Sequence, residues 1–167
     1  EARINEFHAD PTAPFVELFN ANSVALNLGG TWISDDPQNL KKLQLPPDFH
    51  LPARGLVALT RQQLGESFVL ARTTGFVALT SAKGDRVIDA IQLDRGNKTV
   101  GKNAPVETSS TSTPPDQITL PRGRHSDGGT ELVVLREPTP GQSNRARAPV
   151  GLVINEIHYH APASRSD

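Results

Sequence analysis

Turn residues cut this chain into short segments of β-type sequence. The 167 residues include 13 Gly and 14 Pro, and clusters such as Asp35-Asp36-Pro37 interrupt the chain before a long helix can form. Between these breaks, apolar residues alternate with polar ones or form brief β-branched runs, which is typical of strands. The pattern predicts an all-β fold in which two sheets pack as a sandwich.

Strands are expected wherever such a segment lies between two turn signals. The predicted strands are 2–8, 15–19, 24–28, 32–33, 43–45, 55–60, 76–80, 86–91 and 131–136. Lys83-Gly84-Asp85 predicts a hairpin turn in which Gly84 takes a positive φ. Residues 62–72 are interrupted by Gly65, so we expect a loop or one helical turn there. The polar residues 94–115 predict a long exposed loop.

The core is expected at the alternating and wholly apolar strand positions, with Trp32 as the largest contributor to burial. The predicted core residues are Ile4, Val16, Leu18, Trp32, Leu45, Val57, Leu79, Ile88, Ile91 and Val133. Ile4 and Phe7 are three residues apart, and a flat strand cannot place both on one face. A β-bulge or a switch between sheets is therefore predicted in the first strand.

The start of the chain is repeated near its end. Ala2-Arg3-Ile4-Asn5-Glu6-Phe7-His8 is echoed by Leu152-Val153-Ile154-Asn155-Glu156-Ile157-His158, just beyond a terminal Pro-Gly signal at 138–141. Such spacing indicates tandem domains. We expect a β-sandwich over residues 1–144, a linker over 145–150 and, over 151–167, the first strand of a following repeat or an assembly strand.

The second copy of the strand has three possible fates. It opens the next domain of the same chain, it pairs with an edge of its own sandwich, or it completes a neighbouring subunit by β-augmentation. The side chains expected at an assembly interface are Leu152, Val153, Ile154, Ile157 and Tyr159. A head-to-tail contact of this kind would propagate into a fibre.

Composition excludes several classes of site. The chain has no Cys, so a disulfide framework, a thiolate zinc site and a cysteine nucleophile are ruled out. Seventeen basic residues balance 18 acidic ones, so no strong field attracts nucleic acid, and the apolar runs are too short for membrane insertion. With no Met and with Glu1 first, the chain is expected to be a piece of a longer polypeptide.

The residues that resemble metal ligands favour structural roles. His158 and His160 would share one face of a strand, but no third ligand is placed by the local sequence. Asp35-Asp36, Asp85 and Asp89 could supply oxygens to calcium, yet they are too few at any one loop and favour turn chemistry. No metal and no cofactor are predicted.

Two carboxylates lie inside apolar segments, Glu6 after Asn5 and Glu17 in the second strand. Such a pair could perform acid–base chemistry, but the favoured role is to satisfy backbone groups where the first strand bends. The chain lacks a nucleophile elbow, a phosphate loop and a dinucleotide fingerprint, so no enzyme is predicted. The basic clusters 122–125 and 145–147 lack aromatic stacking partners, which argues against nucleic acid.

Taken in order, several motifs give the chain a resemblance to the lamin tail domain family, in its bacterial secreted and surface form. The motifs are Ile4-Asn5-Glu6-Phe7, Phe15-Val16-Glu17-Leu18-Phe19-Asn20, the stretches 26–36 and 45–55, and Pro138-Thr139-Pro140-Gly141-Gln142-Ser143-Asn144. The chain departs from the family by inserting Gly30-Thr31 before the tryptophan and by carrying a long Ser/Thr loop near Thr108.

The resemblance implies an immunoglobulin-like β-sandwich that acts without catalysis. Lamin tail domains are interaction modules, so the expected function is a structural module of a large extracellular or cell-surface bacterial protein, in tandem or fibrous assembly. The expected partners are neighbouring copies of the same domain or another protein. The alternative is an accessory binding domain attached to a secreted hydrolase.

Overall fold

The computed structural model describes residues 1–70, 75–92 and 121–145. Short antiparallel strands make up nearly all of the regular structure, with a single helical turn, α1 (Arg61–Leu64). The strands are β1 (Ala2–His8), β2 (Phe15–Asn20), β3 (Leu26–Asn27), β4 (Trp32–Ser34), β5 (Leu43–Gln44), β6 (His50–Leu51), β7 (Leu56–Thr60), β8 (Phe76–Thr80), β9 (Val87–Gln92), β10 (Arg122–Arg124) and β11 (Leu132–Val134). The all-β prediction is confirmed. Where a loop or one helical turn was expected over 62–72, the structure has one helical turn at 61–64 followed by a loop as far as residue 70.

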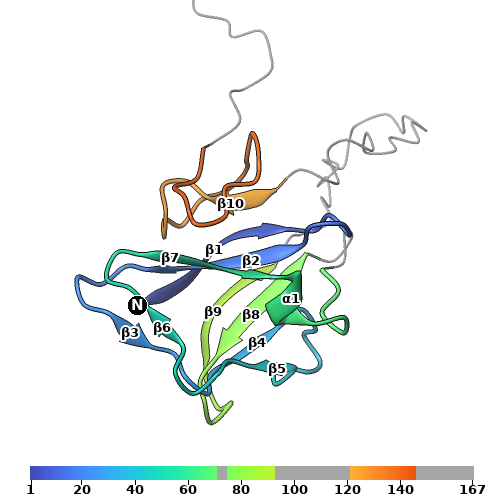
Figure 1. Cartoon of the computed structure of the whole chain (residues 1–167), viewed down its shortest axis with the longest axis vertical. Coiled ribbons are helices and arrows are strands. Elements are labelled where there is room, and N and C mark those ends of the chain that lie inside the picture. The colour runs from blue at the N-terminus through green and yellow to red at the C-terminus, as the bar shows by residue number, and fades with distance from the viewer. Residues whose placement is uncertain (71–74, 93–120, 146–167) are drawn as a thin grey trace, which may run out of the picture.

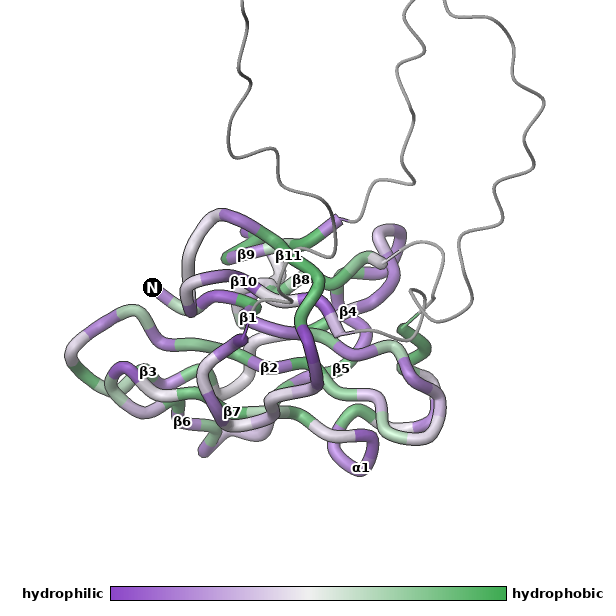
Figure 2. Tube along the Cα trace, turned by 90° about the horizontal axis from the view of Figure 1, so that it is seen from above, coloured by the Kyte–Doolittle hydropathy of each residue, from purple (hydrophilic) through white to green (hydrophobic). Residues whose placement is uncertain are grey.

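The strands form a sandwich. One sheet has the order β11-β10-β1-β2-β7 and the other the order β5-β4-β8-β9, while β3 and β6 form a separate pair. Figure 1 shows β4, β8 and β9 in a layer beneath β1, β2 and β7. Viewed from above, β10, β1, β2 and β7 follow one another across the molecule (Figure 2). β1 is therefore a central strand.

The hydrophobic core lies between the two sheets and mostly follows the prediction. Of the expected core residues, those that are buried are Ile4, Val16, Leu18, Leu45, Leu79 and Ile91, while Val57 and Ile88 are half-buried and pack against the core. Val133 is half-buried and lies outside the core, where its neighbour Leu132 packs instead. The prediction for Trp32 was wrong, because its ring is only half-buried and its Nε1 donates to the carbonyl of Ala82 at 3.1 Å. Neighbouring side chains on β4 face opposite ways, and Ile33 takes the inward position.

The bulge predicted in β1 is present. Ile4 pairs with Leu18 and Glu6 pairs with Glu17, so Asn5 is an extra residue on the β1 side. This insertion shifts the alternation by one position. Ile4 and Phe7 consequently both reach the core, where they are 0% and 3% exposed.

The predicted hairpin joins β8 to β9. Its turn contains Gly84, whose φ is 74°, and the Gly84 amide donates to the carbonyl of Ser81 at 2.8 Å. Two strands were not predicted, β6 and β10. The sequence of β10 is Arg-Gly-Arg, which carries no apolar alternation, and it becomes a strand because it pairs with β1 on one side and β11 on the other.

Residues 135–145 follow β11 and are called the closing segment below. They lie over the face of β1 and β2 that points away from the core, in the orange and red part of Figure 1. Leu135, at the start of this segment, is fully buried and its amide donates to the carbonyl of Pro121 at 2.9 Å. As a result, β1 and β2 are covered on both faces.

Several predictions fall outside the described residues. These are the whole loop over 94–115, the linker beyond Arg145, and the segment 151–167 with its five proposed interface residues and its His pair. Within the part of the chain that the structure describes, no helix is long and apolar enough to cross a membrane.

Candidate functional site

Six polar side chains meet beneath the closing segment, on the outer face of β1 and β2. They are Asn5, Glu6, Glu17, Asp127, Thr139 and Asn144, and we call them the polar clamp. All are buried except Asp127, which is half-buried. Their burial means that each polar atom needs a partner inside the protein.

Glu6 holds the first part of the closing segment. Its carboxylate accepts the Thr139 amide at 3.1 Å and the Thr139 hydroxyl at 2.6 Å. Thr139 also contacts the Asn144 side-chain oxygen at 3.1 Å, and its carbonyl accepts the Gln142 amide at 2.9 Å. The carboxylate thus binds the turn that brings residues 139–144 back on themselves.

Glu17 holds the tip of that turn. Its Oε2 accepts the Gly141 amide at 2.5 Å, and its Oε1 accepts the Asn5 side-chain amide at 3.1 Å. Gly141 has a φ of 75°, a left-handed conformation that strongly favours glycine. The turn conformation and the carboxylate together determine where the Gly141 amide points.

The bulge residue Asn5 connects Glu17 to the rest of the clamp. Its side-chain amide donates to Glu17 and, at 3.0 Å, to Asp127, while its side-chain oxygen accepts the Gly128 amide at 2.9 Å. Asn144 completes the network by donating to the carbonyls of Asn5 at 3.1 Å and Arg124 at 2.8 Å. The extra residue in β1 is therefore the centre of the clamp.

Burial raises the pKa of both glutamates in the clamp, Glu6 and Glu17. Desolvation raises the pKa of Glu17 to about 7, against the hydrogen bonds from Asn5 and Gly141, which lower it, and the negative charges of Glu6 and Asp127 raise it further. Desolvation also raises the pKa of Glu6, opposed by the Thr139 hydrogen bonds and by His8. Glu17 consequently changes its protonation near neutral pH.

A buried ion pair supports the bulge from the side of the second sheet. Asp89 on β9 accepts the Ile4 amide at 2.8 Å and the Arg124 guanidinium at 3.0 Å, and Arg124 donates to the Ile4 carbonyl at 2.8 Å. Both backbone groups of Ile4 are satisfied in this way. Arg124 is 7% exposed, so it is not available as part of a basic surface, and Asp89 serves an ion pair instead of a calcium loop.

The side chains of the clamp are directed at one another and at backbone groups, and its two glutamates are not accessible from solvent. Glu6 and Glu17 are both 0% exposed, and every side-chain polar atom of the clamp that is fully buried has a partner. The predicted role, in which these carboxylates satisfy backbone groups, is confirmed for Glu6 and Glu17. The amides that they bind, however, belong to the closing segment and not to the bend of β1, whose groups are served by Asp89 and Arg124.

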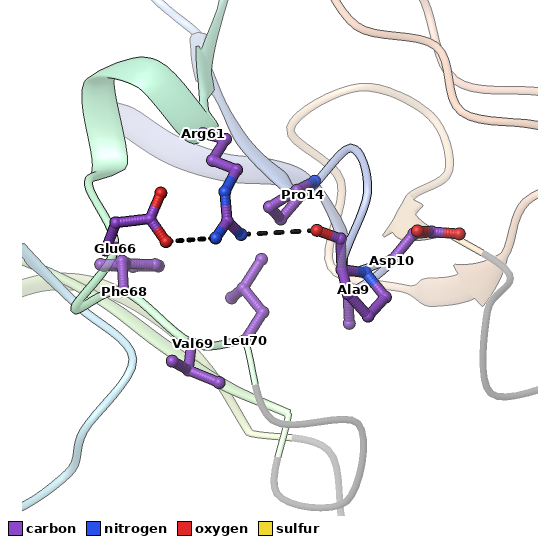
Figure 3. A pocket seen from close by; sticks show the side chains of 9 residues that line it. Ala9, Asp10, Pro14, Arg61, Glu66, Phe68, Val69 and Leu70 are labelled. Carbon is purple, nitrogen blue, oxygen red and sulfur yellow. Dashed lines mark hydrogen bonds and ion pairs between the residues drawn. The ribbon is translucent and has the colours of Figure 1, made fainter.

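A pocket of about 210 Å³ lies elsewhere, between the loop after β1 and the segment after α1 (Figure 3). Arg61 extends into it, contacts Glu66 and donates to the carbonyl of Pro11 at 3.4 Å. Its apolar lining includes Phe68, Val69 and Leu70. No residue of the polar clamp lines this pocket, so the carboxylates with raised pKa values and the cavity do not combine into one site.

The remaining acidic candidates lie in turns or in an ion pair. Asp36 accepts the Gln38 amide at 2.9 Å, and Asp85 accepts the Ser81 hydroxyl at 2.6 Å, as the turn interpretation predicts. Asp35 pairs with Lys42 at 2.5 Å. Among residues 1–70, 75–92 and 121–145, no group of three or more His, Asp or Glu side chains is arranged to hold a metal ion.

Sequence reasoning found the carboxylates but missed Asp127, Thr139 and Asn144 as members of the polar clamp. Thr139 and Asn144 belong to the motif 138–144, which was their only signal in the sequence, and Asp127 lies outside that motif. In comparisons with protein-family models, curated proteins and solved structures, nothing matches this chain. The likeness to lamin tail domains therefore rests on the sequence motifs.

Proposed function

We propose that this chain is a non-catalytic structural and interaction module of a large secreted or cell-surface bacterial protein, of the lamin tail type, in tandem or fibrous assembly. The observation that carries the proposal is that the polar clamp fastens the closing segment to β1 and β2. The two carboxylates best suited to acid–base chemistry are buried and bound to amides of the closing segment. Groups used in this way stabilise a fold and do not meet a substrate.

The position of β1 suits a module whose two ends connect to neighbours. β1 lies at the start of the chain, yet it is central in its sheet, hydrogen-bonded to β10 and to β2. The closing segment, at the other end of the domain, binds the bulge of β1 through Asn144. Load applied at either end would reach the same clamp, which is useful in a chain of linked domains.

The second candidate function is an accessory binding domain of a secreted hydrolase, and the pocket favours it. Pro11, Pro14 and Phe68 offer flat apolar surfaces beside the charged pair of Arg61 and Glu66. Such a mixture is typical of sites that bind small ligands or peptide segments. At about 210 Å³, the pocket is small compared with the roughly 300–1,000 Å³ of most ligand sites, so the structural module remains the main proposal.

Assembly is tested by comparing residues 1–167 with a chain that ends at Pro149. We expect the longer chain to form multimers in light scattering and electron microscopy, and the shorter chain to stay a folded monomer with the same urea midpoint. The control is circular dichroism of both chains, which should show the same β-sheet spectrum. Assembly of the shorter chain to the same extent would overturn the proposal.

The absence of catalysis is tested on peptide, ester, glycoside and phosphate substrates. We expect no turnover above background with the purified protein. Turnover that a single substitution, such as Glu17→Gln, removes without unfolding the protein would contradict the proposal. Turnover that survives this substitution and others at polar positions would indicate a contaminating enzyme.

A further inference from the structure

The repeated segment keeps the residues through which β1 is held in place. Four positions are identical in the two copies and a fifth keeps its apolar character. The matched pairs are Ile4 with Ile154, Asn5 with Asn155, Glu6 with Glu156, Phe7 with Ile157, and His8 with His158.

Four of the five matched positions have defined roles in β1. Ile4 and Phe7 fill the core between the sheets. Asn5 forms the bulge that lets both of them point inward, and it bridges Glu17 and Asp127. Glu6 holds Thr139 of the closing segment. The repeat thus preserves the spacing of the core residues together with the polar pair between them.

We propose that residues 152–158 bind a second copy of this domain as β1 does, between β10 and β2, with Asn155 at the bulge and Glu156 on the closing segment. The binding surface is the place that β1 occupies, lined by the apolar side chains of Val16 and Leu18 inside and by Thr139 outside. The partner is a copy of the same domain. The inference rests on the proposed function and gives its assembly contact a position and a register.

Two differences make the second copy the weaker strand. Leu152 is larger than Ala2, which is 3% exposed and tightly packed, and Val153 cannot reproduce the contact of Arg3 with Asp89 at 3.7 Å. β1 is also tethered to β2 by a short loop, which gives it a high effective concentration. Residues 152–158 therefore take the place of β1 where β1 is released or disabled, and otherwise exchange at high protein concentration.

The test uses the full chain and introduces charged residues into β1, into residues 152–158, or into both. In the Ile4→Asp/Phe7→Asp variant, β1 cannot enter the core, and we expect residues 152–158 of another copy to replace it. This variant should keep a β-sheet spectrum and a cooperative urea transition, as dimers or longer assemblies in light scattering. Adding Ile154→Asp/Ile157→Asp should abolish the transition, whereas these two substitutions alone should leave a folded monomer.

Two results would overturn the proposal. If the Ile4→Asp/Phe7→Asp variant is unfolded, residues 152–158 cannot replace β1. If that variant is a folded monomer, the segment fills the place in its own domain, and the second copy is not the partner.

A peptide experiment tests the register. The chain with all four substitutions is mixed with a synthetic peptide of residues 151–160, which should restore the cooperative transition. A matched peptide that lacks Asn155 should fail, because a one-residue slip turns Ile157 away from the core. Restoration by both peptides would contradict the proposed bulge, and a peptide of residues 1–9 serves as the positive control.

These experiments distinguish a failure of the strand inference from a failure of the proposed function. If the unsubstituted chain never assembles but residues 152–158 rescue the disabled one, the strand inference holds and the assembly function fails. If the unsubstituted chain assembles and the rescue fails, assembly uses a different contact.

Discussion

Both faces of β2 carry fully buried side chains, but the two faces are stabilised by different chemistry. On the inner face, Val16 and Leu18 are 0% exposed and pack with Ile33 and Leu79 in the core. On the outer face, Glu17 is also 0% exposed, and its carboxylate is bound to Asn5 and Gly141. One short strand therefore separates an apolar interior from a polar one.

The comparison shows that burial alone does not say how a region is stabilised. Apolar packing gains free energy in proportion to the area removed from water and is insensitive to pH. A buried polar network depends on every partner, because an orphaned group carries the full cost of desolvation. The inner face should respond to side-chain volume, and the outer face to hydrogen bonding and to protonation.

The largest expected effect is on the inner face. Leu18→Ala removes a fully buried side chain and should lower the free energy of unfolding by about 4 kcal/mol, because of the lost transfer free energy and the cavity left behind. Urea denaturation at two pH values measures it. The loss should be the same at both pH values, and a loss that grows with pH would contradict the division between the faces.

The outer face should show the opposite behaviour. The pKa of Glu17 is raised from 4.5 to about 7, so the folded state binds a proton more tightly than the unfolded state. Stability from this group is complete below pH 4.5 and is lost as pH rises through 7, by about 3 kcal/mol in total. Urea midpoints between pH 4.5 and 8 should fall accordingly.

Glu17→Gln is the matched variant for this prediction. It keeps the size of the side chain and one acceptor oxygen but cannot titrate, so the fall in midpoint with pH should be reduced. Part of the fall should remain, because burial also raises the pKa of Glu6. An unchanged pH profile in this variant would show that Glu17 does not titrate in the folded protein.

Gly123→Ala tests how closely the closing segment approaches β10. A Cβ atom at this position would lie 2.5 Å from the Asn144 side-chain nitrogen and 2.8 Å from Leu135. We expect a loss of about 2 kcal/mol from overpacking. Gly65→Ala is the contrasting variant, because an added Cβ there has no atom within 4 Å while the φ of Gly65 is 76°. It should cost about 1 kcal/mol from backbone strain alone, without overpacking.

The smallest effect is expected at an exposed carboxylate. Glu66 pairs with Arg61, but its side chain is 82% exposed, so water screens the interaction. Glu66→Gln should change stability by about 0.5 kcal/mol or less. Comparing the stability changes of Glu66→Gln and Glu17→Gln under the same conditions separates the effect of burial from the effect of losing a carboxylate. Equal changes would show that burial of Glu17 does not matter.

Local sequence patterns were sufficient to predict those features whose structure depends only on neighbouring residues. The alternation in residues 15–19 predicted a strand, and the glycine at position 84 predicted a turn. The three-residue spacing of Ile4 and Phe7 predicted a bulge or a switch between sheets. The strand, the turn and the bulge are all present. The position of Glu6 and Glu17 inside apolar segments also predicted that these carboxylates bind backbone groups, although not which ones. None of these features requires knowledge of distant contacts, because each follows from side-chain direction or backbone freedom.

The tertiary structure decided what these patterns leave open. Alternation places Glu17 opposite Val16 and Leu18, but only the closing segment, more than 100 residues later in the chain, buries it. Trp32 and Ile33 are both plausible core residues, and the pairing of β4 with β8 turned Ile33 inward. β10 is a strand because its backbone pairs with the edge of β1 that β2 does not occupy. These outcomes depend on contacts between distant segments, which bury polar groups as readily as apolar ones when every hydrogen bond is met.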